Sequence, residues 1–345
     1  MRHWFRRLVL APAVIVVTVL VLTTVPLWLL AAALLSPIVP GRLRPLRILW
    51  LVLMHLVLES IILVELFGLW VASGFGRYLR RPYFERIHYD IVQAYLVIFF
   101  REARRVARLK IVTEGDPPDA FPGEPLLVCS RHAGPADSFT LMYALMHWYG
   151  REPRVVLRDT LAWDPAIDVI LHRLPSRFIS PGGGDRLEEQ VGELARNLDE
   201  NDAFVIFPEG GNFTPERRTR AIAKLRRLGL ETMARRAERM ENVLAPRPGG
   251  LLAALDAAPD ADVVLVAHTG LDHVLTVADA WRELPMDKQI IMRWWRVPRA
   301  EVPTGREERI DWLFAWWQRI DDWIAEHRPE DLPPQRWGRQ VRARR

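Results

Sequence analysis

The sequence contains very little cysteine and very little lysine. Its single cysteine, Cys129, excludes an internal disulfide and a cysteine-rich zinc site. Cys129 lies within the apolar run LLVCS, so we expect a small, buried core residue. Only three of the 47 basic residues are lysines, and the formal net charge of +5 therefore comes from arginine. Because arginine binds phosphate in a bidentate manner, we expect an anionic partner: nucleic acid, a lipid headgroup or a phosphorylated substrate.

Two common enzyme signatures are also absent. There is no Gly-x-Ser-x-Gly nucleophile elbow, and the turn PGGGD (181–185) lacks the Gly-Lys-Ser/Thr ending of a P-loop. His268 and His273 follow an apolar run without a patterned acid partner, so we expect no metal site. The sequence thus favours neither serine nucleophile chemistry nor nucleotide hydrolysis.

Long apolar segments fill the first 75 residues. Residues 8–40 carry no charge, and this run exceeds the roughly 20 residues that a membrane-spanning helix needs. The run is also longer than a signal-peptide core. A second segment, 48–75, is interrupted only by His55, Glu59 and Glu65. The pair predicts membrane helices or a re-entrant hairpin, and the two glutamates leave open a buried helix of a soluble domain for the second segment.

Arginines flank both apolar segments. They precede the first, separate the two and follow the second (Arg2, Arg6, Arg7, Arg42, Arg44, Arg47, Arg77, Arg80 and Arg81). The positive-inside rule therefore does not separate a spanning hairpin from a shallow one. Either arrangement places the rest of the chain on the side of the N-terminus. We expect a membrane protein whose remaining chain lies on the cytoplasmic face.

The rest of the chain has the pattern of an α/β domain. Short apolar runs at 126–130, 154–158, 177–180, 203–207 and 263–267 alternate with helical patterns at about 137–149, 163–173, 185–199 and 216–240. This alternation predicts a mixed, mostly parallel sheet flanked by helices. We divide the chain into membrane helices or a hairpin (1–75), a basic amphipathic connector (76–120), an α/β domain (121–300), and a tryptophan-rich helix with a basic tail (301–345).

The C-terminal segment 306–328 predicts an amphipathic helix. One side carries Ile310, Leu313, Phe314, Trp317, Ile320 and Ile324, and a second stripe carries Trp312, Trp316 and Trp323. We expect this helix to pack against the α/β domain. Because tryptophan prefers the membrane interface, docking on lipid is the alternative.

Polar residues follow the strand expected at 126–130, in SRHAGPADSF. Ligands bind outside the carboxyl ends of parallel strands, so His132 and Asp137 are placed to meet one. Asp137 would hold one imidazole nitrogen, and the other would take a proton from a substrate hydroxyl. The alternative is Asp137 as a helix N-cap and His132 as a surface residue. The pair alone does not decide between them.

A second polar cluster, FPEGGNFTPERR (207–218), follows the strand expected at 203–207. Gly210 and Gly211 let the backbone approach a ligand closely. With His132 placed 77 residues before Glu209, the chain resembles the lysophospholipid acyltransferase family, which makes phosphatidic acid from lysophosphatidic acid. RDTLAWDP (158–165) resembles that family's Lys-x2-Leu-x3-Pro segment, with Arg158 in place of lysine. ENVLAPRPGGLL (241–252) resembles its Pro-Arg-x-x-Gly stretch.

The chain departs from the family pattern in two places. Gly211-Asn212 replaces a Thr-Arg whose arginine binds substrate phosphate in the family, and 263–270 lacks an expected proline. Either Arg217, Arg218 or Arg247 replaces that arginine, or the acceptor differs. The basic run 217–239 is otherwise expected to be a solvated helix face.

The resemblance implies a membrane-bound acyltransferase. His132, held by Asp137, would deprotonate an acceptor hydroxyl that attacks the thioester of acyl-CoA or acyl carrier protein. Glu209, Gly210 and Gly211 would help to bind the acceptor, together with the arginines named above. The implied partners are the lipid bilayer, this acyl donor and a lysophospholipid, with no further cofactor. Two alternatives remain, another lysolipid or glycolipid acceptor and a non-catalytic role; the apolar segments disfavour a nucleic-acid binder.

Overall fold

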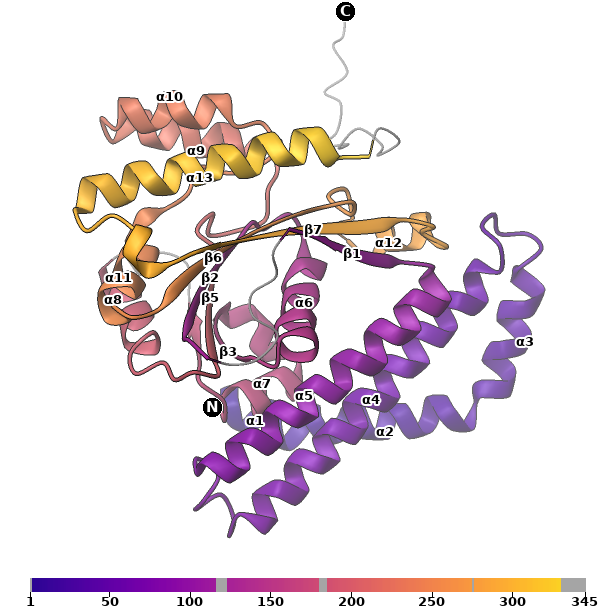
Figure 1. The fold of residues 1–345 in the computed structure, drawn as a ribbon. Helices are drawn as coiled ribbons and strands as arrows, with labels where there is room; N and C mark the ends of the chain where they lie inside the picture. The colour runs from indigo at the N-terminus through magenta and orange to yellow at the C-terminus, as the bar shows by residue number, and fades with distance from the viewer. Residues whose placement is uncertain (1, 116–122, 180–184, 275, 330–345) are drawn as a thin grey trace, which may run out of the picture.

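Long apolar helices form a layer at one side of the molecule (Figure 1). The computed structural model describes residues 2–115, 123–179, 185–274 and 276–329. The layer consists of α1 (Arg2–Phe5), η1 (Arg6–Leu10), α2 (Ala11–Thr23), α3 (Val25–Leu35), α4 (Arg44–Ala72), α5 (Pro82–Glu102) and η2 (Ala103–Ala107). Arg6–Thr23 and Arg44–Ala72 are long and apolar enough to cross a membrane. Helices α2 and α4 lie side by side, and Ser60 donates a hydrogen bond to Thr18 between them.

A seven-stranded sheet lies next to this layer, in the order β1-β7-β6-β2-β5-β3-β4. The strands are β1 (Lys110–Glu114), β2 (Leu126–Ser130), β3 (Glu152–Arg158), β4 (Ser176–Ile179), β5 (Asp202–Ile206), β6 (Asp262–Thr269) and β7 (Gln289–Val297). Neighbouring strands are parallel, except for β6 and β7. The predicted fold class, an α/β fold with a mixed, mostly parallel sheet, is confirmed, as are all five predicted strands.

Helices cover both faces of the sheet (Figure 1). The helices of this part of the chain are α6 (Pro135–Tyr143), η3 (Ala144–Trp148), η4 (Asp159–Trp163), α7 (Pro165–Leu171), α8 (Asp185–Leu194), α9 (Pro215–Arg227), α10 (Glu231–Arg239), α11 (Pro248–Ala257), α12 (Val277–Glu283), η5 (Arg299–Glu301) and α13 (Arg306–His327). Side chains alternate along β2, so Leu127 and Cys129 pack towards α8, α11 and α13, whereas Leu126 and Val128 pack towards α6. Cys129 is a buried core residue, as predicted, and burial raises the pKa of its thiol.

The C-terminal helix α13 packs against the α/β domain. All six residues of its predicted apolar stripe are buried in the core that it shares with α11 and β6. Of the second stripe, Trp316 and Trp323 contact Trp295 of β7, with ring centroids 6.0 and 6.2 Å apart. Both stripes of α13 therefore pack against the α/β domain, as the first of the two interpretations predicted.

The structure differs from the predicted elements in three places. Strands β1 and β7 were not predicted, and β1 falls within the segment expected to be a connector. The helix predicted over 216–240 is broken into α9 and α10, because Gly229 between them adopts a left-handed conformation with φ of 74°. Four of the five residues of the PGGGD turn (181–184) lie outside the described residues.

One face of α4 packs on the α/β domain. Ile62, Leu63 and Leu66 join a core with Ala166 and Ile170 of α7. Most of α4 is not buried, and its apolar residues include exposed side chains, so the alternative of a buried soluble helix does not describe it. The two apolar N-terminal helices thus have a protein-facing side and an exposed apolar side, which indicates association with a membrane.

Candidate active site

The carboxyl ends of β2, β5, β3 and β6 meet at one edge of the sheet, because these strands are mutually parallel. His132 follows β2, Glu209 follows β5, Arg158 ends β3 and His268 lies near the end of β6. This edge of the sheet therefore brings together residues from four separate segments.

His132 and Asp137 face each other at this edge. His132 Nδ1 lies 3.6 Å from Asp137 Oδ2, in a partly exposed ring whose Nδ1 is buried and has no hydrogen-bond partner. The distance is longer than a hydrogen bond, and contacts of this kind shorten when substrate binds. The ring packs against Phe207, with centroids 4.5 Å apart. This arrangement directs Nδ1 to the carboxylate and leaves Nε2 for a substrate.

Asp137 has a structural role in addition to facing His132. It occupies the third position of α6, whose N-cap is Gly134, and its Oδ2 accepts hydrogen bonds from the N–H groups of Ala133 and Gly134. Burial alone would raise the pKa of Asp137, but His268, His132 and the Gly134 N–H together hold it below its usual value. Asp137 is therefore ionised at neutral pH. It stabilises the helix start without being its N-cap.

The buried Glu209 side chain accepts hydrogen bonds from the backbone of the His132 segment and of a second segment. Its Oε1 accepts the N–H of His132 at 3.0 Å, and its Oε2 accepts the N–H of Leu244 at 2.8 Å. Only 1% of the residue is exposed. Burial raises the pKa of Glu209 to about 8, against the opposing effects of Arg131 and the two donors. The Glu209 side chain thus links its own segment after β5 to the segments that contain His132 and Leu244.

The sequence analysis did not identify three further residues as part of the site: Arg131, Asp272 and His268. Arg131 is buried, pairs with Asp272 and donates hydrogen bonds to the carbonyls of His268 and Asn242 at 2.6 and 3.0 Å. His268 Nε2 lies 3.6 Å from Asp137 Oδ2 and 3.2 Å from the Arg131 carbonyl. Asp272, four residues after His268, pairs with Arg131, and the pairing of β2 with β6 brings His268 close to Asp137. Burial lowers the pKa of His268.

Three arginines converge on the backbone that follows Glu209. A Cβ atom at Gly210, whose φ is 67°, would lie 2.9 Å from Arg247 Nη1. A Cβ atom at Gly211 would lie 3.1 Å from both Arg158 Nη2 and Arg217 Nη1. Glycine at both positions therefore lets the three guanidinium groups approach the main chain.

These arginines form a cationic cluster. Within the described part of the chain, none of the three forms an ion pair with a carboxylate. Burial, together with the neighbouring Arg158 and Arg220, lowers the pKa of Arg217. We refer to Arg158, Arg217 and Arg247 as the arginine cluster. Such an arrangement suits a bound anion.

Arg218 lies elsewhere. Its guanidinium donates hydrogen bonds to the carbonyls of Met240 and Glu238, at 2.5 and 2.8 Å, and so ties α9 to the end of α10. Of the arginines considered from the sequence, Arg158, Arg217 and Arg247 are brought together and Arg218 is not.

Comparison with known proteins agrees with the motifs. The family model described as Acyltransferase matches residues 91–266, slightly more than half of the chain. The chain belongs to this family. An acyltransferase requires an acyl donor and an acceptor, and the resemblance based on the His-x4-Asp and FPEGG motifs is confirmed. No curated protein matches the sequence. The crystal structure of the 1-acyl-sn-glycerophosphate (LPA) acyltransferase PlsC from Thermotoga maritima is similar, with a TM-score of 0.45 and 13% identity over 77% of this chain and 97% of that one.

Proposed function

We propose that this acyltransferase transfers a fatty acyl group from acyl-CoA or acyl carrier protein to the hydroxyl of lysophosphatidic acid, giving phosphatidic acid. The observation that carries the proposal is the meeting of the His132–Asp137 pair with the arginine cluster at one sheet edge. The pair supplies a base for the hydroxyl. The cluster supplies cations for the phosphate of the same acceptor.

His132 Nε2 accepts the proton of the acceptor hydroxyl as its oxygen attacks the thioester carbonyl. The resulting imidazolium is stabilised by the ionised Asp137 and then returns the proton to the departing thiol. Glu209 keeps the His132 backbone in place during both steps. No covalent acyl-enzyme is required.

The arginine cluster also accounts for the departure from the family pattern after Glu-Gly. Gly211-Asn212 stands where the family carries Thr-Arg, and guanidinium groups from three other segments surround this point. Arg217 is further fixed by a hydrogen bond to the Asn212 carbonyl at 3.0 Å. We infer that these side chains take over the phosphate contact, so lysophosphatidic acid remains the favoured acceptor.

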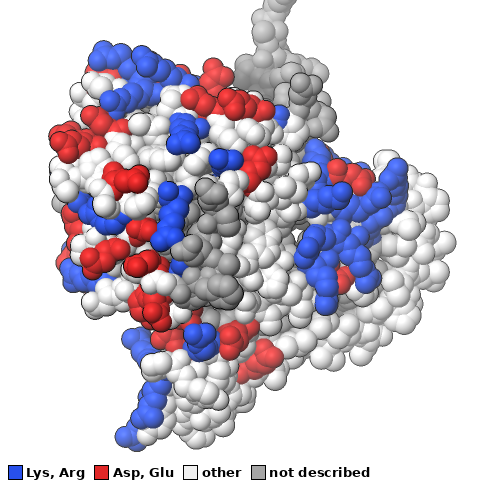
Figure 2. Space-filling view, in the orientation of Figure 1, with Lys and Arg blue, Asp and Glu red and all other residues white. Residues whose placement is uncertain are grey.

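The surface supports a bilayer as the working environment. Figure 2 shows basic side chains gathered beside the largely uncharged surface of the helical layer. Exposed arginines in this part of the chain include Arg42 before α4 and Arg101, Arg105 and Arg108 at the end of α5 and η2. Apolar helices bordered by arginine suit insertion next to anionic headgroups. We place the α/β part on the cytoplasmic face.

The test is acylation of a lysolipid panel by the full chain in detergent, with labelled acyl-CoA or acyl carrier protein. We expect lysophosphatidic acid to be preferred over uncharged monoacylglycerol. Arg247→Met should lower kcat/KM for lysophosphatidic acid roughly 10- to 100-fold, since a hydrogen bond to a charged group contributes about 1.5–3 kcal/mol. The monoacylglycerol rate should change little.

Arg235→Met is the matched control, because Arg235 is exposed on α10, outside the arginine cluster. Preference for an uncharged or glycosylated lysolipid would assign the alternative acceptor. Failure to acylate any lysolipid with either donor would contradict the proposed function.

A further inference from the structure

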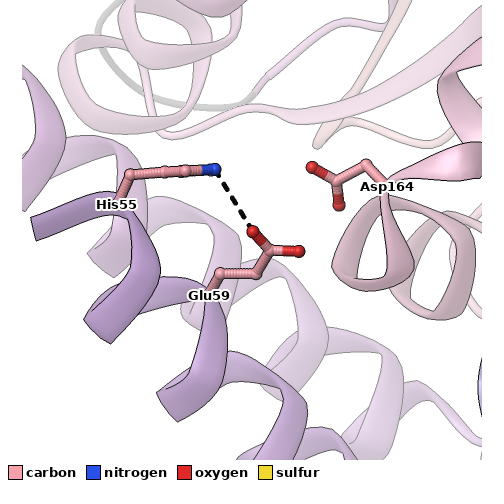
Figure 3. A group of neighbouring side chains, drawn as sticks. All are labelled: His55, Glu59 and Asp164. Carbon is pink, nitrogen blue, oxygen red and sulfur yellow. Dashed lines mark ion pairs between the residues drawn. The ribbon is translucent and has the colours of Figure 1, made fainter. Parts of the chain in front are cut away.

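Three side chains with metal-ligating groups meet where the helical layer contacts the α/β domain. His55 and Glu59 lie one turn apart on α4, and Asp164 faces them from the start of α7 (Figure 3). One nitrogen or oxygen atom from each residue lies within 4.8 Å of those of the other two. We propose that His55, Glu59 and Asp164 bind a divalent transition-metal ion such as Zn²⁺ or Mn²⁺.

Each ligand is presented by a defined local structure. Residues four apart on a helix share one face, so His55 and Glu59 point the same way, with Nε2 and Oε2 3.2 Å apart. Asp164 is the N-cap of α7, and its Oδ1 accepts the Ile167 N–H at 2.9 Å. That bond fixes the carboxylate and leaves Oδ2 available.

The second nitrogen of His55 has its own partner. The Tyr95 hydroxyl lies 3.4 Å from His55 Nδ1. Metal-bound histidines commonly hydrogen-bond through the nitrogen that does not bind the metal, which fixes the tautomer and the orientation of the ring. Tyr95 is therefore placed to keep Nε2 unprotonated and directed at the cluster.

The charges of the cluster are not balanced by protein cations. Glu59 is only 6% exposed, and in the part of the chain that the structure describes neither Glu59 nor Asp164 forms an ion pair with arginine or lysine. One imidazolium would offset only one of the two carboxylates. A divalent ion with a neutral histidine and two carboxylates is charge-neutral, which removes the cost of a buried unpaired charge.

The charge of a neighbouring carboxylate, Asp168, is balanced by arginine instead. Asp168, one turn after Asp164 on α7, is fully buried at the same contact and binds Arg6 at 2.7 Å and Arg7 at 3.0 Å. Among the described residues, arginine therefore pairs with one acid at this interface, Asp168, and with neither Glu59 nor Asp164. This contrast favours an external cation at Glu59 and Asp164.

The geometry requires a small contraction. Ligand atoms bound to zinc at about 2.0–2.2 Å lie roughly 3–4 Å from one another, so separations of up to 4.8 Å must shorten by about 1 Å. His55 is partly exposed, which leaves an open side for water. The bound ion would link α4 to the α/β domain.

The test uses the full chain in detergent, freed of metal by chelation and titrated with Zn²⁺ or Mn²⁺ alone by calorimetry. We expect one equivalent to bind and to raise the unfolding temperature. Asp164→Asn removes the ligand charge but retains a good N-cap residue. This variant and Glu59→Gln should each weaken binding by more than the roughly 100-fold that outer-shell changes produce, and Tyr95→Phe by about 10-fold.

Glu65→Gln is the control, since Glu65 is an exposed carboxylate on the same helix. It should bind metal like the wild type. Absence of one-equivalent binding by the wild-type chain overturns the proposal, whatever the variants do. Wild-type affinity in both Asp164→Asn and Glu59→Gln overturns it as well. Because the readout is metal binding, neither result depends on acyl transfer.

Discussion

The strand-edge site (His132, Asp137 and Glu209) and the α4 cluster (His55, Glu59 and Asp164) each combine a histidine with two carboxylates, but their charges are compensated differently. At the strand edge, Asp137 accepts two backbone N–H groups and Glu209 accepts two others. Buried Arg131 lies close enough to act electrostatically on both. In the α4 cluster, by contrast, the described residues give Glu59 one ion-pair partner, His55.

The difference separates two kinds of site. Where fixed backbone donors and an internal arginine hold the carboxylates, the histidine beside them is preorganised for proton transfer without an added ion. In the α4 cluster Asp164 has a backbone donor, but no described arginine or lysine pairs with either carboxylate, and the proposed metal ion would complete the charge balance. Each prediction below replaces one residue of the strand-edge site or one residue that contacts it, beginning with His132.

Replacing His132 has the largest expected effect. His132→Gln removes the proposed general base, and kcat should fall by roughly 100- to 10,000-fold. The KM for lysophosphatidic acid should change little, because the arginine cluster is intact. Initial rates with labelled acyl-CoA provide the measurement. His147→Gln, at an exposed histidine on η3, is the control; a kcat within a few-fold of wild type in His132→Gln would remove His132 from the mechanism.

Replacing Arg131 tests the internal cation. Arg131→Met leaves Asp272 buried without its partner, so the free energy of unfolding should fall by about 3–5 kcal/mol. Adding Asp272→Asn to this variant should recover part of the loss by removing the unpaired charge. Urea denaturation measures both.

Arg177→Met breaks an exposed ion pair with Glu193 and serves as the comparison for Arg131→Met. It should cost at most about 1 kcal/mol. Equal costs for Arg131→Met and Arg177→Met would show that the strand-edge site does not depend on its buried arginine.

Local pattern in the sequence predicted much of this fold. The five predicted strands are short apolar runs that alternate with helical patterns. His132, Asp137 and Glu209 follow the ends of two of these strands. Strand β7 was missed because two arginines interrupt the apolar residues of its sequence, QIIMRWWRV, and because it lies outside that regular series. Its antiparallel pairing with β6 depends on contacts distant in sequence.

The rest of the site depends on which strands become neighbours. His268 meets Asp137 because β6 pairs with β2, with Ser130 opposite Val266. No local pattern specifies that pairing. Likewise, the sequence offered both Arg218 and Arg247 as replacements for the missing arginine, and only the fold directs Arg247 to Gly210 and Arg218 to the carbonyls of α10.

A smaller effect is expected at Glu209. In Glu209→Gln an amide NH₂ replaces one carboxylate oxygen, so either the His132 or the Leu244 N–H loses its acceptor. Leaving a buried donor unsatisfied costs about 1–3 kcal/mol of unfolding free energy. Urea denaturation of the variant and the wild type measures this cost.

The cost at Glu209 should also depend on pH. The pKa of Glu209 rises from an ordinary value of 4.5 to about 8 on folding, so the folded state binds the proton more tightly. The resulting stabilisation is fully present below about pH 4.5 and is lost as the pH rises through 8. Glu209→Gln should therefore be more destabilising at pH 5.5 than at pH 8.5. Exposed Glu216→Gln should show no such trend, and a cost that grows with pH would reverse the assignment.

The smallest effect is expected at His268, a positioning residue that acts through Asp137. Its Nε2 lies between the Asp137 carboxylate and the Arg131 carbonyl, beside a cavity of about 10 Å³ that has room for roughly one water. His268→Gln should lower kcat by up to about 10-fold, the equivalent of one hydrogen bond, without changing KM. Because His268 helps to hold the pKa of Asp137 low, the pKa of the Asp137 carboxyl, followed by NMR titration, should rise in His268→Gln. A purely structural residue would leave that pKa in place, as should His273→Gln, whose ring pairs with Glu283 instead. An unshifted Asp137 pKa in His268→Gln would mean that the backbone donors and His132 alone keep Asp137 ionised.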